Sequence, residues 1–114
     1  MDLSLKTRKV DGVVVIDLAG KLSGGEPVQL LRSAVHQFIE EGRRKFLINL
    51  GEVSYIDSSG LGELITTYVS LRNRGGDVKL LNLTKRIKDL LQMTKLLTVF
   101  DCFDDEAKAL QSYL

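Results

Sequence analysis

The sequence predicts an α/β fold: an N-terminal β-hairpin, then alternating helices and strands that build a mostly parallel five-stranded sheet with four helices. Three observations support this prediction. Asp11 and Gly12 separate two strand-like segments, short apolar runs recur along the chain, and segments with helical spacing of apolar residues lie between those runs. Strict alternation after a hairpin is typical of parallel strands joined by right-handed crossovers.

The first two strands are expected to form the hairpin. Residues 3–10 alternate between the two faces of a strand, and Asp11 and Gly12 tolerate the positive φ angles of a tight turn. Residues 13–18 (VVVIDL) are an almost unbroken apolar run, which is typical of a strand covered on both faces. The second strand is therefore expected inside the sheet.

A loop and the first helix follow. Residues 20–26 (GKLSGGE) are interpreted as a loop, and Pro27 is expected at the first helical position, which its fixed φ angle fits. Apolar residues then recur at helical spacing as far as Ile39. Gly42 supplies the left-handed residue that ends such a helix.

The next strand and helix surround the most unusual motif of the chain. Residues 45–50 (KFLINL) predict a strand, and residues 51–56 lead from it to the motif. A helix follows and ends at the glycines at positions 75 and 76. The apolar positions assigned to its buried face are Leu61, Leu64, Ile65, Tyr68 and Leu71.

The last third of the chain predicts two more strands and two short helices. Residues 78–83 (VKLLNL) are assigned to a strand, and Thr84 is the expected N-cap of a helix. Residues 98–102 (TVFDC) are assigned to the last strand. Two aspartates then open the final helix, where negative charge is favourable. Its inward positions are expected to be Ala107, Leu110 and Leu114.

The composition fits a single globular domain over residues 1–114. Apolar residues make up 44% and charged residues 27%, and 16 basic against 15 acidic side chains leave a net charge of +1. This balance gives no electrostatic reason for binding nucleic acid or an anionic membrane. The chain has no signal-like start and no apolar run near the roughly 18 residues of a membrane span. We expect a cytoplasmic protein, either a monomer or a weak dimer.

No enzyme, cofactor or metal site is predicted. A serine hydrolase would need GxSxG and a partnered histidine, but the single histidine, His36, lies among polar positions of its helix. No P-loop spacing is present, so a nucleotide-binding role is not favoured. Cys102 is the only cysteine, which excludes an internal disulfide and a thiolate metal cluster.

The stretch YIDSSGLGEL (residues 55–64) falls at the carboxyl end of a parallel strand, where open α/β sheets place their sites. Asp57, Ser58 and Ser59 can all cap the following helix, although one cap suffices. Gly60 and Gly62 each destabilise a helix by about 1 kcal/mol relative to alanine. Two such residues in one helical turn are better explained if another molecule must approach closely there. From the residues alone, both a displayed serine and simple capping stay open.

This motif resembles the signature of the STAS family, the anti-sigma factor antagonist domain. The resemblance rests on IDSSGLGEL after KFLINLGEV, on RNRGGDVKLLNL at residues 72–83 and on VFDCFDDEAKAL at residues 99–110. It covers about residues 3–113, nearly the whole chain. The resemblance implies the STAS fold and a role in transcription regulation through protein–protein interaction.

The resemblance further implies phosphorylation-controlled partner switching. In the family, the serine after the aspartate is phosphorylated by an ATP-using anti-sigma factor kinase, and here that serine is Ser58. The unphosphorylated form binds the anti-sigma factor and frees the sigma factor, and a PP2C-type phosphatase resets the phosphorylated form. We expect the phosphate to act at the interface and to leave the fold unchanged. The implied partner-binding residues are Asp57, Ser59, Gly60, Leu61, Gly62, Ser23, Gly24 and Glu26.

The loop after the second strand departs from the family pattern. Kinase substrates in the family commonly carry an aspartate after Gly-x-Leu, whereas Ser23 occupies that place here and Glu26 follows nearby. The loop is expected beside the Ser58 turn. The departure leaves an alternative open: a constitutive, non-phosphorylated STAS interaction or scaffold module in a larger signalling or membrane-associated assembly.

Overall fold

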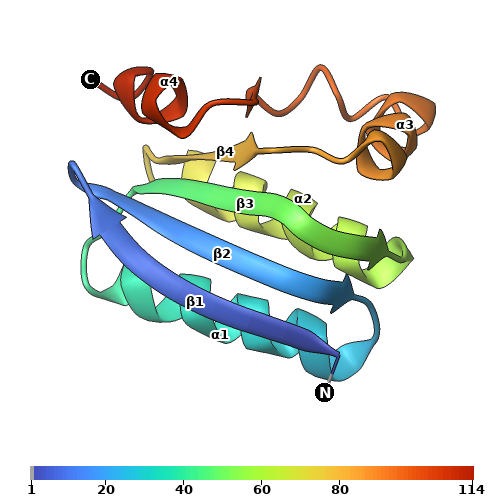
Figure 1. Cartoon of the computed structure of the whole chain (residues 1–114). Helices are drawn as coiled ribbons and strands as arrows, with labels where there is room; N and C mark the ends of the chain where they lie inside the picture. The colour runs from blue at the N-terminus through green and yellow to red at the C-terminus, as the bar shows by residue number, and fades with distance from the viewer. Residues whose placement is uncertain (1) are drawn as a thin grey trace.

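The five strands form one sheet in the order β1-β2-β3-β4-β5 (Figure 1), and only the β1–β2 pair is antiparallel. The predicted α/β fold is therefore confirmed. This arrangement comes from a computed structural model, which describes residues 2–114. The strands are β1 (Leu3–Val10), β2 (Val13–Leu22), β3 (Lys45–Ile56), β4 (Asp77–Leu81) and β5 (Cys102–Phe103). The helices are α1 (Gly25–Glu40), α2 (Ser58–Arg72), α3 (Lys85–Met93) and α4 (Glu106–Gln111).

The helices cover both faces of the sheet. Helices α1 and α2 lie along one face, and α4 lies across the other (Figure 1). The larger core forms between the sheet and α1, α2 and α3, with Phe46 and Ile48 of β3 fully buried in it. A smaller core under α4 joins Val15 and Leu47 to Ala109 and Leu110. Strand β2 is thus covered on both faces, as its apolar run predicts.

Several predicted turns and caps are confirmed. Asp11 and Gly12 both adopt positive φ angles, 53° and 80°, in the hairpin turn. Gly42 has φ +90° immediately after the α1 C-cap residue. The Thr84 hydroxyl accepts a hydrogen bond from the backbone N–H of Ile87 at 3.3 Å and so caps α3. Within residues 2–114, no helix is long and apolar enough to cross a bilayer.

The predicted loop at residues 20–26 is wrong, because both neighbouring elements are longer than expected. Strand β2 continues to Leu22, which is fully buried and pairs with Ile56 of β3. Helix α1 begins at Gly25, two residues before Pro27. Only residues 23–24 lie between β2 and α1. Because Leu22 pairs with Ile56, the end of β2 lies close to the start of α2.

The last strand is also misplaced in the prediction. Residues 98–100 form a turn, and β5 comprises only Cys102 and Phe103, which pair with Leu80 and Leu81 of β4. The reason is Phe100, which turns inward and packs edge-on against Tyr68 of α2, with ring centroids 5.3 Å apart. Strand β4 ends earlier than predicted because Asn82 has φ +60°, which is incompatible with an extended strand.

The buried positions of the final helix differ from the expected set. Ala109 and Leu110 are buried, whereas Ala107 is exposed and Leu114, beyond the helix end, is 91% exposed. The end of the chain is anchored instead by Tyr113, whose single hydroxyl proton is shared between the backbone oxygens of Phe46 at 2.7 Å and Asp77 at 3.0 Å.

Candidate functional site

The candidate site forms where the carboxyl ends of β2 and β3 meet. Leu22 and Ile56 are paired in adjacent parallel strands, so the residues that follow each strand end are neighbours. Residues 23–24 therefore lie beside residues 57–59, as the alternating topology predicts. Asp57 is extended and forms the N-cap of α2, and Ser58 is the first residue of that helix.

The Asp57 carboxylate holds the two segments together. Its Oδ1 accepts hydrogen bonds from the Ser59 hydroxyl at 2.6 Å and the Gly60 N–H at 2.9 Å. Its Oδ2 accepts from the Ser23 hydroxyl and the Gly24 N–H, both at 3.1 Å. These donors, the Ser59 hydroxyl foremost, lower the pKa of Asp57 to about 2. Asp57 therefore stays charged at neutral pH and serves as the central acceptor of the site.

The two serines of the motif have different surroundings. The Ser59 hydroxyl donates to Asp57 and also accepts a hydrogen bond from the Gly24 N–H at 3.2 Å. The Ser58 side chain is exposed at the start of α2, and within residues 2–114 its hydroxyl makes no hydrogen bond to another protein group. Ser59 is thus a structural link, whereas Ser58 presents a free hydroxyl to solvent.

Ser23 has a role that a carboxylate could not fill. Its hydroxyl donates to Asp57, whereas an ionised aspartate at this position could only accept and would repel Asp57. The Ser23 hydrogen bond, together with that of Gly24, fixes the short β2–α1 loop against α2. Ser23, which stands where an aspartate was expected from the resemblance, thus joins the loop to Asp57 through an uncharged hydroxyl.

The two glycines of the motif serve different purposes. Gly60 is buried, and a Cβ atom there would overlap the carbonyl oxygen of Leu22 and press on the Leu22 side chain. The expectation that Gly60 makes room for another molecule is therefore wrong, because the space is needed by the end of β2. A Cβ atom at Gly62 would meet no atom within 4 Å, so that position is open.

The remaining predicted site residues lie around this centre. Gly24 is exposed and has φ +80°, which its role as a tight link requires. Glu26 is exposed in the first turn of α1, and Leu61 is half-buried against the larger core. The structure thus brings Ser23 and Gly24 into contact with Asp57 and places Glu26 and Leu61 in the adjoining helical turns.

Sequence reasoning missed an ion pair between a buried glutamate of α2 and an exposed arginine of α1. Glu63 of α2 is 3% exposed, and its Oε1 accepts from the guanidinium group of Arg32 of α1 at 2.7 and 2.9 Å. Helical spacing of apolar residues cannot reveal it, because a charged side chain occupies the buried face of α2. The buried set of α2 is Gly60, Glu63, Leu64, Thr67 and Leu71.

Other reactive chemistry is not evident in the described residues. In the part of the chain that the structure describes, no three His, Cys, Asp or Glu side chains could hold a metal ion. Cys102 is half-buried, and burial raises the pKa of its thiol to about 11. The thiol is therefore neutral at physiological pH and a poor nucleophile.

Replacing Asp57 with alanine is expected to lower the free energy of unfolding by about 1–2 kcal/mol at neutral pH, because it removes the α2 cap and the tie to the loop. The lowered pKa sets the pH dependence. The carboxylate stabilises the fold above its unfolded pKa, about 3.9, and this contribution disappears as the pH falls through about 2. Urea unfolding of both proteins between neutral and acidic pH measures the difference.

Asp57→Asn is the matched control, because its amide oxygen still accepts from the Gly60 N–H and retains the cap. It should lose less stability than Asp57→Ala. A stability difference between the native chain and Asp57→Ala that stayed constant down to the acid limit would contradict the assigned role of the charge.

The chain is similar to known proteins over most of its length. A family model described as the STAS domain matches residues 4–109. The anti-sigma-B factor antagonist of Bacillus subtilis (strain 168) is 30% identical over 102 residues, which cover 89% of this chain and 91% of that protein. A putative anti-sigma factor antagonist from Thermotoga maritima superposes with a TM-score of 0.84 at 25% identity, covering 95% of this chain and 92% of that one. The Bacillus protein SpoIIAA, solved in its phosphorylated form, shares the fold with a TM-score of 0.78 at 23% identity, covering 97% of this chain and all of that one.

Proposed function

The chain belongs to the STAS domain family, and from this premise we propose that it is a cytoplasmic anti-sigma factor antagonist controlled by phosphorylation of Ser58. The unphosphorylated chain binds an anti-sigma factor kinase, and phosphorylation releases it. The name of the Bacillus subtilis relative supports the antagonist role. The observation that supports the switch is the free, exposed Ser58 hydroxyl beside Asp57 and Ser59, whose side chains are both hydrogen-bonded.

The proposed reaction uses Ser58 as an acceptor and leaves catalysis to the kinase. The Ser58 oxygen forms a bond to the γ-phosphorus of ATP, the bond to ADP breaks, and a base of the kinase takes the hydroxyl proton. Asp57 is not placed to serve as that base, because both of its carboxylate oxygens accept hydrogen bonds from other groups and neither accepts one from the Ser58 hydroxyl. A PP2C-type phosphatase returns the chain to its binding form.

The charge of the phosphate explains how the switch would work. A phosphoserine adds about −1.5 to −2 charges at neutral pH. The α2 N-terminus favours this charge by about 0.3–1 kcal/mol, and the Asp57 carboxylate opposes it. The Asp57 carboxylate is held in place by hydrogen bonds from the Ser59 hydroxyl and the Gly60 N–H, so phosphorylation of Ser58 should change the fold little. Burying the dianion in an interface without a matched cation costs several kcal/mol, which favours release of the partner.

A constitutive scaffold of the same family is the second candidate, and Ser23 is the observation that favours it. A neutral serine stands where kinase substrates of the family commonly carry an aspartate, and its hydroxyl is directed to Asp57. In this case the same surface would bind its partner without a phosphorylation cycle. The two candidates differ in whether a kinase modifies Ser58.

Incubating the chain with ATP and the anti-sigma factor kinases of the same genome is expected to attach one phosphate, at Ser58. Ser58→Ala should accept none, and Ser59→Ala should still be modified at Ser58, because the Ser59 hydroxyl is engaged with Asp57 and Gly24. Peptide mapping by mass spectrometry locates the phosphate. A phosphate confined to Ser59 would refute the assignment, and an unmodified chain that still bound a kinase would favour the scaffold.

A further inference from the structure

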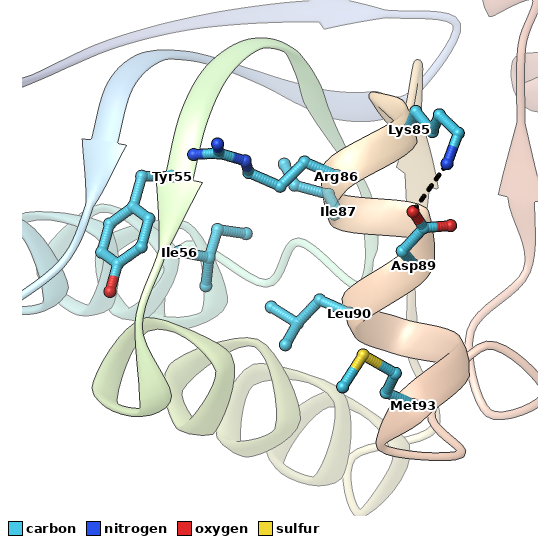
Figure 2. A pocket seen from close by; sticks show the side chains of 8 residues that line it. All are labelled: Tyr55, Ile56, Lys85, Arg86, Ile87, Asp89, Leu90 and Met93. Atoms are coloured by element: carbon cyan, nitrogen blue, oxygen red, sulfur yellow. Dashed lines mark hydrogen bonds and ion pairs between the residues drawn. The ribbon is translucent and has the colours of Figure 1, made fainter.

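A groove adjoins the Ser58 turn and lies outside the hydrogen-bonded site around Asp57. It lies between the end of β3 and helix α3, has a volume of about 510 Å³, and is shown in Figure 2. Its walls come from Tyr55 and Ile56 of β3 and from the face of α3 that carries Arg86, Leu90 and Met93. We call this hollow the α3 groove.

The floor of the α3 groove is apolar and partly exposed. Leu90 and Met93 point from α3 toward Ile56 (Figure 2), and they share a helix face because they are three residues apart. The Met93 side chain is 81% exposed and Tyr55 is 43% exposed. Single exposed apolar residues are common, but a contiguous apolar hollow marks an interaction site more often than chance exposure does.

The rim of the α3 groove is cationic. Lys85 and Arg86 line the groove and are both exposed in the first turn of α3, which contains no acidic residue. Cations at this end of a helix are opposed by the helix dipole, so the charge of Arg86 does not stabilise α3 through the dipole. Asp89 compensates only Lys85, at 2.9 Å. Among the described residues that line the groove, Arg86 is therefore the cation without a carboxylate partner, and it complements an acidic group on a partner.

The groove is continuous with the Ser58 turn. Tyr55 and Ile56 directly precede Asp57 in the chain. Arg86 also lines a second hollow of about 470 Å³, together with Ser23 at the start of the β2–α1 loop. The Ser23 hydroxyl in turn donates a hydrogen bond to the Asp57 carboxylate. One surface thus runs from Met93 past the end of β3 to the loop that borders the Ser58 turn.

We propose that the α3 groove is a second contact region for the anti-sigma factor kinase, and that it receives a segment of that protein with an aliphatic side chain next to acidic ones. This inference rests on the proposed function. The groove supplies apolar and charge-complementary affinity, whereas Ser58 supplies the switch. Because the two regions adjoin, one partner can cover both at once.

Mutations on the floor and on the rim test this assignment against the anti-sigma factor kinase that binds the native chain. Met93→Glu and Arg86→Glu should each weaken binding by about 10-fold, equivalent to about 1.4 kcal/mol, in calorimetric titrations. High salt should weaken binding of the native chain more than binding of Arg86→Glu. The matched controls are Leu114→Glu, at a side chain 91% exposed, and Lys45→Glu, at the opposite end of β3, and both should bind normally.

Methyl spectroscopy of the native chain gives an independent readout. The chain contains two methionines, so selective labelling of methionine methyl groups gives a simple spectrum, and Met93→Leu assigns the Met93 signal. That signal should shift or broaden when the kinase is added. The same titration should leave labelled alanine methyl groups of α4 unchanged, because α4 covers the opposite face of the sheet.

The outcomes separate the two proposals. If Ser58→Asp abolishes kinase binding while Met93→Glu and Arg86→Glu bind normally, the groove inference fails and the proposed function stands. If no kinase binds the native chain, both fail. If Met93→Glu changes only the sedimentation of the chain itself, the groove is an interface between two copies and the inference is overturned.

Discussion

Gly60→Ala is expected to lower the free energy of unfolding by about 2–3 kcal/mol, although alanine is the better helix former by about 1 kcal/mol. The new methyl group would overlap the carbonyl oxygen of Leu22 and lie 3.1 Å from the Cγ2 atom of Ile56. Neither neighbour can move easily, because Leu22 and Ile56 are paired in adjacent strands. Helix α2 would have to shift away from the sheet, and the site at its N-terminus would shift with it.

Gly62→Ala is the matched control, two residues along the same helix. A methyl group there meets no atom within 4 Å, so this variant should gain about 0.5–1 kcal/mol from helix propensity alone. Urea unfolding followed by circular dichroism compares the two variants. Equal stabilities for both would show that β2 does not approach α2 as closely as the Leu22–Gly60 contact implies.

The fold could be predicted because its signals are local. The Asp11–Gly12 turn, the Gly42 stop and the Thr84 cap each depend on residues a few positions apart, and each is confirmed. The prediction failed where a distant contact overrides local composition. The glycine-rich segment at residues 20–26 looks like a loop, yet Leu22 is drawn into the sheet by its pairing with Ile56.

In the candidate site, too, the features set by local sequence could be predicted and those set by distant contacts could not. The adjacency of the two loops follows from strand order, and the capping role of Asp57 follows from its place before α2. The direction of the Ser23 hydrogen bond and the buried charge of Glu63 do not follow, because each depends on a partner more than 30 positions away in the sequence. Motif spacing could therefore locate the site without distinguishing the bonded Ser59 from the free Ser58.

Ser58→Asp is expected to weaken binding of the anti-sigma factor kinase by about 5- to 150-fold, the range of a coupling of about 1–3 kcal/mol. The substitution places a permanent negative charge at the exposed start of α2, beside the charged Asp57. Two neighbouring carboxylates in a closing interface need matched cations on the partner, and a surface that fits the neutral hydroxyl does not supply them. The stability of the free chain should change little, because the helix N-terminus favours the charge that Asp57 opposes.

Two controls make this result specific to the site. Ser58→Ala should bind as tightly as the native chain, because the Ser58 hydroxyl makes no hydrogen bond within residues 2–114 that its loss could break. Ser33→Asp adds the same charge at an exposed position of α1 away from the turn and should also bind normally. Equal dissociation constants for Ser58→Asp and Ser33→Asp, measured by calorimetry, would remove the switch and leave the constitutive scaffold. A selective loss at position 58 with unchanged thermal unfolding would place the effect at the interface, because a charge that disturbed the fold would also lower the unfolding temperature.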